Sequence, residues 1–121
     1  MKIASRTVSA TIQVVGHHSW PNAPAEVLFL RAAHRHLFVI TATFNVGHAD
    51  RQLEFFMLQR KMRIIIASAF EIVYVGEYNF ENCSCEHVAE KIGIAFANKS
   101  MPIQSVTVSE DTENSSTVTW S

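Results

Sequence analysis

The feature that most constrains the fold is an alternation of apolar and polar residues in two separate stretches of the chain. It runs through residues 5–17 and returns in residues 35–47. Because successive side chains of a β-strand point to opposite faces, each stretch predicts a strand with one buried face. The alternating apolar positions are Val8, Ala10, Ile12 and Val14 in the first stretch, and Phe38, Ile40, Ala42, Phe44 and Val46, together with His36, in the second.

Two later stretches have a helical period instead. Apolar residues at helical spacing predict one amphipathic helix between residues 58 and 69 and a second that begins after Ser84. Ser84 is a favourable N-cap, and Glu86 lies in the first turn, where a negative charge is favourable. The inner stripes are Leu58, Met62, Ile65, Ile66 and Ala69 in the first helix, and Val88, Ile92, Ala95 and Phe96 in the second.

The remaining segments predict short elements. Residues 20–24 predict a turn, after which Asn22 caps a short helix through Leu30. The other expected elements are a brief extension of the sheet at 51–55, a short strand at 72–75, a strand at 103–108, a polar turn at 110–116 and a last strand at 117–120.

These elements predict one domain, residues 1–121, of α+β class. The main order is strand, strand, helix, helix, strand, strand, which favours an antiparallel sheet with both helices packed on one face. Exposed sheet edges invite pairing between copies, so we expect a homo-oligomer formed through them. With 121 residues and 48% hydrophobic content, the chain is long enough to bury a core of its own.

Charge and cysteine content exclude several classes of function. The net charge of -1 is not typical of a protein that binds duplex nucleic acid. Cys83 and Cys85 form one Cys-x-Cys pair, which is not a disulfide framework. No apolar run reaches about 18 residues, and no leader pattern is visible at the N-terminus. We therefore expect a cytoplasmic protein without a membrane partner.

Histidines gather at the predicted strand ends. His34 and His36 lie two apart as a strand begins, so their side chains share one face, and His17 or His18 ends the neighbouring strand. Three imidazoles from adjacent strands form the usual ligand set of a catalytic zinc. The same residues also suit contact with an anion or a purely structural role, and the sequence leaves all three alternatives open.

Arginines flank the histidines. Arg31 and Arg35 predict a local cationic patch, because guanidinium groups match phosphate with two parallel hydrogen bonds. Arg51 is a further candidate, although the alternating charges of residues 50–54 favour a salt bridge at a turn.

Aromatic and acidic residues outside the core pattern suggest contacts with a nucleotide base. Trp20 lies in a turn and Phe80 in a polar segment, so either ring is a candidate stacking platform, as is Tyr78. Glu110 and Asn114, at a strand end, are candidate readers of a base edge, although a solvated turn is the simpler interpretation. Cys85 near a helix start could have a lowered pKa, but His87 points elsewhere on a helix, so we discount cysteine–histidine catalysis.

The order of these motifs resembles the 6-pyruvoyl/6-carboxy-tetrahydropterin synthase superfamily, also called the tunnelling fold. The resemblance implies that His17 or His18, with His34 and His36, binds zinc, and that Glu110 grips a pterin or purine ring. The other similar motifs are Glu54-Phe55 before the first helix and Ser84-Cys85-Glu86 at the start of the second.

Two departures from this superfamily affect the expected chemistry. Its enzymes have a cysteine shortly before the His-x-His, where this chain has residues 29–33 without one. They also have an Asp-His pair between the helices, whereas residues 66–82 contain no histidine. Both groups serve proton transfer, so their absence favours a binding protein over an enzyme.

A second resemblance is to a bacteriophage family, the first type of Thoeris anti-defence protein. It implies a non-enzymatic sponge in the host bacterial cytoplasm that sequesters cyclic ADP-ribose isomers, and in some cases cyclic oligonucleotides, as a dimer or hexamer. The similar motifs are Trp20-Pro21-x-Ala23-Pro24, Phe29-Leu30, His34-Arg35-His36, His48-x-Asp50-Arg51, Glu54-Phe55, Ser84-Cys85-Glu86 and Glu110-Asp111-x-Glu113-Asn114.

Together with this resemblance, the residues lead us to expect, first, a protein that binds cyclic nucleotides without a metal or other cofactor and without cleaving them. Its expected contacts are Trp20, Arg31, His34, Arg35, His36, Arg51, Phe80, Glu110 and Asn114. The alternative is a zinc-dependent lyase or synthase that acts on a pterin-type substrate, with His18, His34 and His36 as metal ligands.

Overall fold

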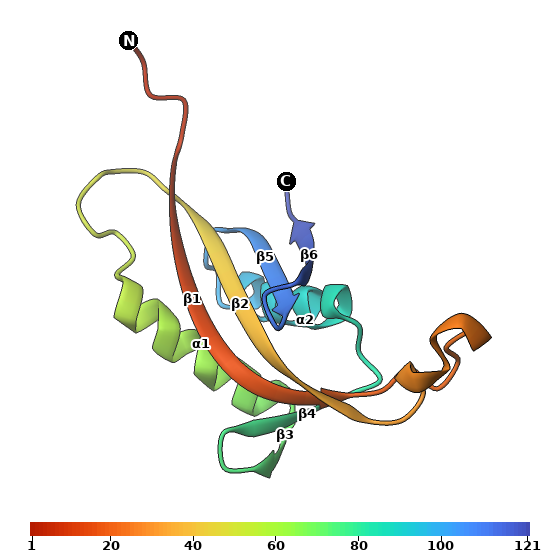
Figure 1. Cartoon of the computed structure of the whole chain (residues 1–121). Coiled ribbons are helices and arrows are strands. Elements are labelled where there is room, and N and C mark those ends of the chain that lie inside the picture. The colour runs from red at the N-terminus through yellow and green to blue at the C-terminus, as the bar shows by residue number, and fades with distance from the viewer.

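A computed structural model describes residues 1–121, and Figure 1 shows its elements along the chain. None of its helices combines the length and the apolar character needed to cross a bilayer. The elements in chain order are β1 (Arg6–His18), the 3-10 helix η1 (Ala25–Leu30), β2 (His34–Val46), α1 (Phe55–Ala69), β3 (Glu71–Tyr74), β4 (Glu77–Glu81), α2 (Cys85–Asn98), β5 (Ile103–Glu110) and β6 (Asn114–Thr119).

The six strands form one sheet in the order β3-β4-β1-β2-β5-β6. Strands β1 and β2 are long neighbours that pair antiparallel from Arg6↔Val46 to His18↔His34. Strand β4 pairs with β1 in parallel, so the sheet is mixed and the prediction of a purely antiparallel sheet was wrong. The reason is the β3–β4 hairpin, which lies between the two α-helices in sequence and returns to the free edge of β1. The predicted order of strand, strand, helix, helix, strand, strand was therefore also wrong, since two strands separate the helices.

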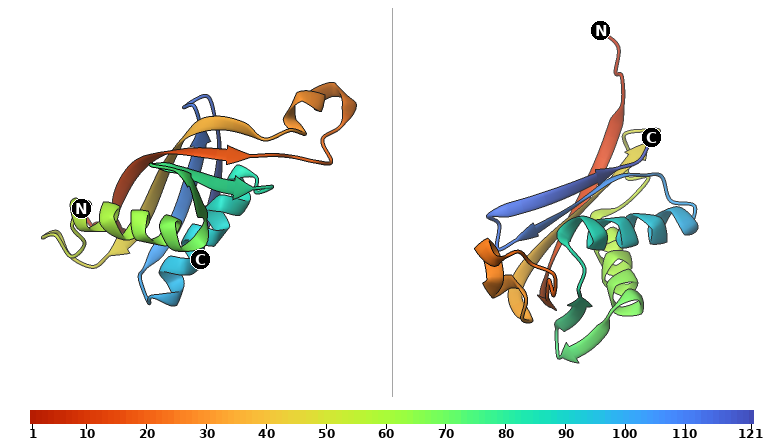
Figure 2. Two further views of the ribbon diagram at one scale, coloured as in Figure 1. Left: turned by 90° about the horizontal axis from the view of Figure 1, so that it is seen from below. Right: turned by 90° about the vertical axis from the view of Figure 1, so that its right-hand side faces the viewer.

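Both α-helices cover the same face of the sheet, as expected, and Figure 2 shows them together on that side. The covered face consists of the even-numbered residues of β1, β2 and β5, since alternate side chains of a strand share a face. The buried strand residues are Ala10, Ile12, Val14, Phe38, Ile40, Ala42, Phe44, Val106 and Val108. They form one core cluster with the helix residues Leu58, Met62, Ile65, Ile66, Val88, Ala89, Ile92 and Phe96.

Side-chain caps fix the start of each α-helix. Ser84 caps α2 as predicted and accepts a hydrogen bond from the backbone N–H of His87 at 3.2 Å. Helix α1 has Glu54 as its cap, whose carboxylate accepts hydrogen bonds from the backbone N–H groups of Phe56 and Met57. Residues 51–54 therefore lead into α1, which begins at Phe55, and the predicted extension of the sheet at 51–55 was wrong.

Two turn predictions also need correction. The helix before Leu30 is a 3-10 helix that begins after Pro24, and no side chain caps it, so Asn22 does not have the predicted role. The polar turn expected at 110–116 is shorter, because β5 continues to Glu110 and β6 already begins at Asn114. Asp111 and Thr112 have left-handed φ angles of 52° and 61°, and this tight geometry lets the two strands pair almost to the turn.

A candidate three-histidine metal centre

The alternation along β1 and β2 brings three histidines to the core face at one end of the sheet. His18 lies directly opposite His34, and His36 follows two residues later on the same face of β2. His17 falls on the other face, where its Nε2 lies 3.1 Å from Oε1 of Glu77. The register thus resolves the choice between His17 and His18, since only His18 faces the other two.

Each of the three rings has its Nδ1 atom engaged by an oxygen that only accepts hydrogen bonds. His18 Nδ1 lies 2.9 Å from the carbonyl oxygen of Cys83, and His34 Nδ1 lies 2.9 Å from that of Ala32. His36 Nδ1 lies 2.7 Å from Oδ2 of Asp111. In each ring Nδ1 is therefore the protonated nitrogen, and in the neutral ring Nε2 keeps its lone pair.

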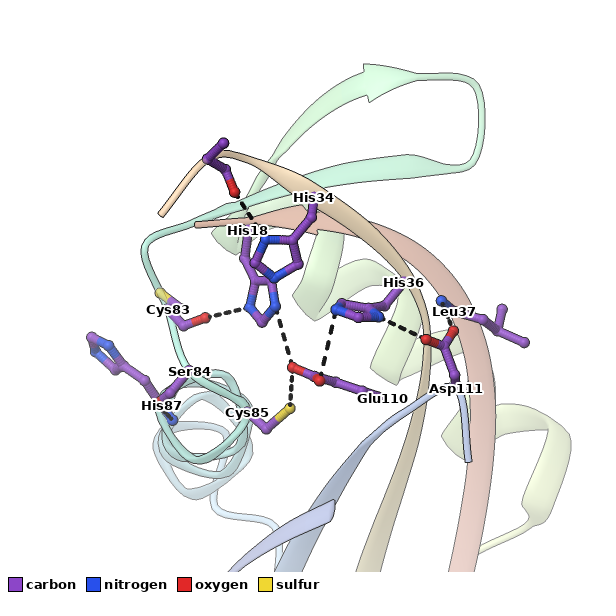
Figure 3. A network of polar contacts seen from close by, with 11 residues as sticks. His18, His34, His36, Leu37, Cys83, Ser84, Cys85, His87, Glu110 and Asp111 are labelled. Atoms are coloured by element: carbon purple, nitrogen blue, oxygen red, sulfur yellow. Dashed lines mark hydrogen bonds and ion pairs between the residues drawn. The ribbon is translucent and has the colours of Figure 1, made fainter. Parts of the chain in front are cut away.

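The rings point toward a common space, as Figure 3 shows. One ring nitrogen from each of His18, His34 and His36 lies within 4.8 Å of the other two. His36 Nε2 is a buried side-chain atom without a hydrogen-bond partner. Neutral imidazoles that are oriented through Nδ1 and keep a free Nε2 are the typical protein ligands of zinc. The residues present therefore fit a zinc ion held by these three histidines.

Glu110 faces the same space. It is the last residue of β5 and continues the even-numbered core face of Val106 and Val108. Its Oε1 lies 3.2 Å from His18 Nε2, and its Oε2 lies 3.7 Å from His36 Nε2. The Cys85 thiol donates a hydrogen bond to Oε1 at 3.5 Å. A carboxylate, three imidazoles and a thiol thus come together from four different elements.

The surroundings shift two pKa values at this centre. Burial lowers the pKa of His18, although the Cys83 carbonyl and the Glu110 charge oppose this effect. Burial, and then the Glu110 carboxylate, raise the pKa of the Cys85 thiol to about 12. The lowered pKa that a position near a helix start suggested for Cys85 is therefore wrong, because desolvation and a neighbouring negative charge dominate.

A cavity of about 500 Å³ opens beside the histidines. Trp20, which is 48% exposed, lies on its lining, and a row of polar residues continues from Glu110 onto β6. The lining residues are His18, Ser19, Trp20, Leu30, His34, Asn82, Cys83, Ser84, Cys85, Glu86, His87, Glu110, Asn114, Ser115 and Ser116. Of the predicted contacts, Trp20, His34, Glu110 and Asn114 are therefore together at one cavity.

The structure does not bring the predicted cationic residues to this cavity. Arg31 donates to the carbonyl oxygen of Ala23 at 2.8 Å, within its own connecting segment. Arg35 lies on the opposite face of the sheet, where it donates to Glu77 at 2.9 Å. Arg51 follows the far end of β2 and pairs with Asp50 at 2.6 Å. The predicted arginine patch is thus replaced by three separate contacts.

Phe80 does not offer a ring to a ligand either. It is fully buried on β4, where its ring packs edge-on against those of Phe38 and Phe70 at centroid distances of 4.8 and 4.6 Å. Tyr78, the other platform on this strand, is half-buried and stacks along Phe80 at 6.5 Å. The polar residues around Phe80 indicated an exposed segment, because the parallel pairing of β4 with β1 has no local signal in the sequence.

Other residues of the site were missed. Asp111 orients His36 through Nδ1 and also accepts the backbone N–H of Leu37 at 2.9 Å. The Cys83 carbonyl orients His18 from the loop before α2. The sequence does show a second acidic residue, Asp111, directly after Glu110. Asp111 comes close to His36 only because β5 pairs with β2.

Comparison with known proteins supports the fold. No family model matches the chain, and no curated protein matches its sequence. An uncharacterised protein from Wolinella succinogenes has a similar structure, with a TM-score of 0.71 and 11% identity over 96% of this chain and 98% of that one. The 6-pyruvoyl tetrahydropterin synthase of Caenorhabditis elegans matches with a TM-score of 0.66 and 17% identity, over 100% of this chain and 99% of that one.

These similarities extend over almost the whole length of both chains, whereas the identities are low. They show the arrangement of the sheet and helices, and they carry no activity from one protein to the other. The chain has the tetrahydropterin synthase-like fold, as its motifs had indicated.

Proposed function

We propose that this protein binds a zinc ion through His18, His34 and His36 and takes a small planar heterocycle in the adjacent cavity. The observation that carries the proposal is the shared orientation of the three rings, each fixed through Nδ1 by an acceptor. Three such ligands leave a metal with room for a further donor, which is the arrangement of a catalytic zinc.

The cavity suits a ligand of pterin or purine size. Its volume of about 500 Å³ lies within the range of sites for small molecules. Trp20 offers a ring face on the lining, while Asn114 and Ser116 offer polar atoms for a heterocycle edge. No arginine lines the cavity, so its chemistry favours an uncharged ring over a ligand recognised through several phosphates.

The resemblance to tetrahydropterin synthases adds a reaction class to this proposal, a zinc-dependent step on a pterin-type substrate. A bound zinc would polarise an oxygen of the ligand or lower the pKa of a bound water. The chain's own residues orient the imidazoles and exclude water from one side of the site, since Phe38 packs against His18 and His36 from the core.

Metal analysis of the purified protein tests the proposal. We expect stoichiometric zinc in the unchanged protein and its loss in the double variant His34→Ala, His36→Ala. A matched control compares His18→Ala with His17→Ala, because these neighbours lie on opposite faces of β1. Loss of zinc in His18→Ala alone supports the site, whereas no zinc in the unchanged protein, or equal losses in both variants, contradicts it.

A second candidate function is sequestration of a cyclic nucleotide, as the resemblance to the Thoeris anti-defence family implies. One observation favours a protein that binds without catalysis. The hairpin between the helices, residues 70–82, contains neither histidine nor aspartate, so the proton-transfer pair of the synthases is missing.

Incubation with cyclic ADP-ribose isomers, followed by heat denaturation, separates the two candidates. Recovery of intact nucleotide in a stoichiometric amount supports sequestration. Recovery of a cleaved nucleotide, or no retention at all, contradicts it. Turnover of an unphosphorylated pterin by the zinc-loaded protein, abolished in His34→Ala, supports the enzyme.

A further inference from the structure

The carboxylate of Glu110 and the ring of His18 face each other in an arrangement that needs a proton or a metal ion between them. His18 donates through Nδ1 to Cys83, so its neutral ring presents a lone pair at Nε2. Glu110 Oε1, which also only accepts, lies 3.2 Å from that nitrogen. Two acceptors at this distance repel each other unless a proton or a metal ion lies between them.

The distances from Glu110 to the Nε2 atoms of His18 and His36 are close to those between two ligands of one metal ion. Zinc lies about 2.0–2.2 Å from nitrogen and carboxylate oxygen ligands, so two ligands of a tetrahedral site are about 3.4 Å apart. The separations of 3.2 Å to His18 and 3.7 Å to His36 lie on either side of this value. The unpartnered His36 Nε2 is then accounted for by the same ion.

We propose that Glu110 is the fourth protein ligand of the metal when the cavity is empty. The proposal rests on the metal site of the proposed function. It changes the coordination of the metal in the empty site, because the position left open by the three imidazoles is occupied by a carboxylate. Glu110 was expected from the sequence to read the edge of a heterocycle, and in the empty site it coordinates the metal instead.

The position of Glu110 is built into the fold. It ends β5 on the core face, directly opposite Phe38, which follows His36 by two residues on β2. The Cys85 thiol donates to Oε1 from the first residue of α2, so the carboxylate is held from the helix as well as from its own strand. Cys85 is therefore a positioning residue, and Figure 3 shows it behind the carboxylate as seen from His18.

A closed site has a consequence for ligand binding. A heterocycle with a metal-binding oxygen must either displace Glu110 or raise the coordination number to five. Once displaced, the carboxylate becomes free to accept hydrogen bonds from N–H groups of the ring. The same residue thus coordinates the metal in the empty site and contacts the ring in the occupied one.

Cobalt substitution tests the proposal without any assay of activity. Co²⁺ bound to the full chain reports its donor set and coordination number through its visible absorption. We expect the spectrum to change in Glu110→Gln and the affinity for Zn²⁺, measured by competition with a chelator, to fall at least about 10-fold. Glu113→Gln is the matched control, because it makes the same change three residues later, at an exposed position of the turn between β5 and β6.

Cys85→Ser should leave the metal bound but alter the spectrum less than Glu110→Gln, as expected of a residue that acts through Glu110. If Glu110→Gln does not fold, the structure of the zinc-loaded unchanged protein still tests whether Glu110 binds the metal. A crystal structure with a Glu110 oxygen about 2.0–2.2 Å from zinc supports the proposal.

The proposal that Glu110 is the fourth ligand is overturned by an unchanged spectrum and affinity in Glu110→Gln. It is also overturned if the Glu110 carboxylate lies beyond bonding distance of the bound zinc. The metal site of the proposed function would survive that result, provided that His34→Ala, His36→Ala still abolishes binding. Absence of metal from the unchanged protein would overturn both proposals.

Discussion

Asp111 determines the orientation of His36 although it lies outside every strand. Its two carboxylate oxygens accept hydrogen bonds from the His36 ring at 2.7 Å and the Leu37 backbone N–H at 2.9 Å. These contacts, and the charges of His36 and Arg35 in addition, lower the pKa of Asp111. A carboxylate held in this way fixes the ring rotation and makes the imidazole a stronger ligand.

Replacing Asp111 by asparagine should weaken zinc binding by about 10–100-fold, because the charge behind His36 is lost while the side chain keeps its size. Asparagine accepts the left-handed backbone found at this position, with φ of 52°, so the turn should persist. Competition against a chelator measures the effect, and Asp50→Asn, at an exposed loop, is the control. Equal affinities in the two variants would show that His36 is oriented without Asp111.

At the level of single residues, the sequence predicted the metal ligands better than it predicted the other contacts. Alternation along one strand places His34 and His36 on a shared face without any knowledge of the fold. The choice between His17 and His18 depends on the register of β1 against β2, which the sequence alone does not specify. The roles of Glu110 and Asp111 depend on the pairing of β5 with β2, which joins residues far apart in the chain.

Helix α2 packs on the sheet through a glycine. At Gly93 an added Cβ would lie 1.9 Å from the ring of Trp120, the residue that follows β6. The ring is further fixed in place because the Trp120 backbone N–H donates to the carbonyl oxygen of Gln104 at 2.8 Å. The closeness of helix and sheet at this point therefore depends on the absence of a side chain.

Gly93→Ala should destabilise the protein by about 1–3 kcal/mol, the usual cost of overpacking a tight interface. Alanine is the better helix former by about 1 kcal/mol, so a purely local effect would have the opposite sign. Urea unfolding measures the difference. In a Trp120→Ala background the same substitution should become neutral or stabilising, and a persistent loss there would place the strain elsewhere.

At the level of elements, local signals predicted both α-helices and the long strands. The helical period of 3.6 residues is a local feature of each helix, as is the Ser84 cap of α2. Strands β1 and β2 are predicted by the alternation of apolar and polar residues. Strand β4 has no such signal in its five residues, Glu77–Glu81. Its parallel pairing with β1 is set by how the hairpin packs after α1 ends, so a mixed sheet did not follow from the sequence.

Viewed as a whole, the molecule has a second polar cluster on the side of the sheet opposite the histidines. There Glu77 of β4 contacts His17 of β1 and Arg35 of β2 at 3.1 and 2.9 Å. Hydrogen bonds from Arg35 and then His17 lower the pKa of Glu77. One carboxylate therefore links three adjacent strands on this face of the sheet.

This cluster predicts how the stability of the protein depends on pH. The contribution of Glu77 should be fully present above its ordinary pKa of 4.5 and be lost as the pH falls through its lowered value in the folded state. The difference in free energy of unfolding between the unchanged protein and Glu77→Gln should therefore shrink between about pH 6 and about pH 3. A difference that stays constant over this range would show that Glu77 is not coupled to folding.

The homo-oligomer expected from the sequence stays a prediction. The edge strand β3 and the turn after it expose four apolar residues. Ile72, Val73, Tyr74 and Val75 are 62%, 55%, 70% and 92% exposed. An apolar edge strand of this kind is a surface where another copy of the chain can pair. The opposite edge, β6, is rich in serine and threonine and offers the same backbone groups.

The opposed directions of His17 and His18 restrict how the length of β1 can vary. A single inserted residue before this pair would turn His17 toward the core face and His18 toward the opposite face. His17 would then lie among the metal ligands, and His18 would lie on the face of Glu77. Two inserted residues would restore both directions and shift only the position along β2. Homologous chains should therefore differ in this strand by even numbers of residues, or compensate with a bulge.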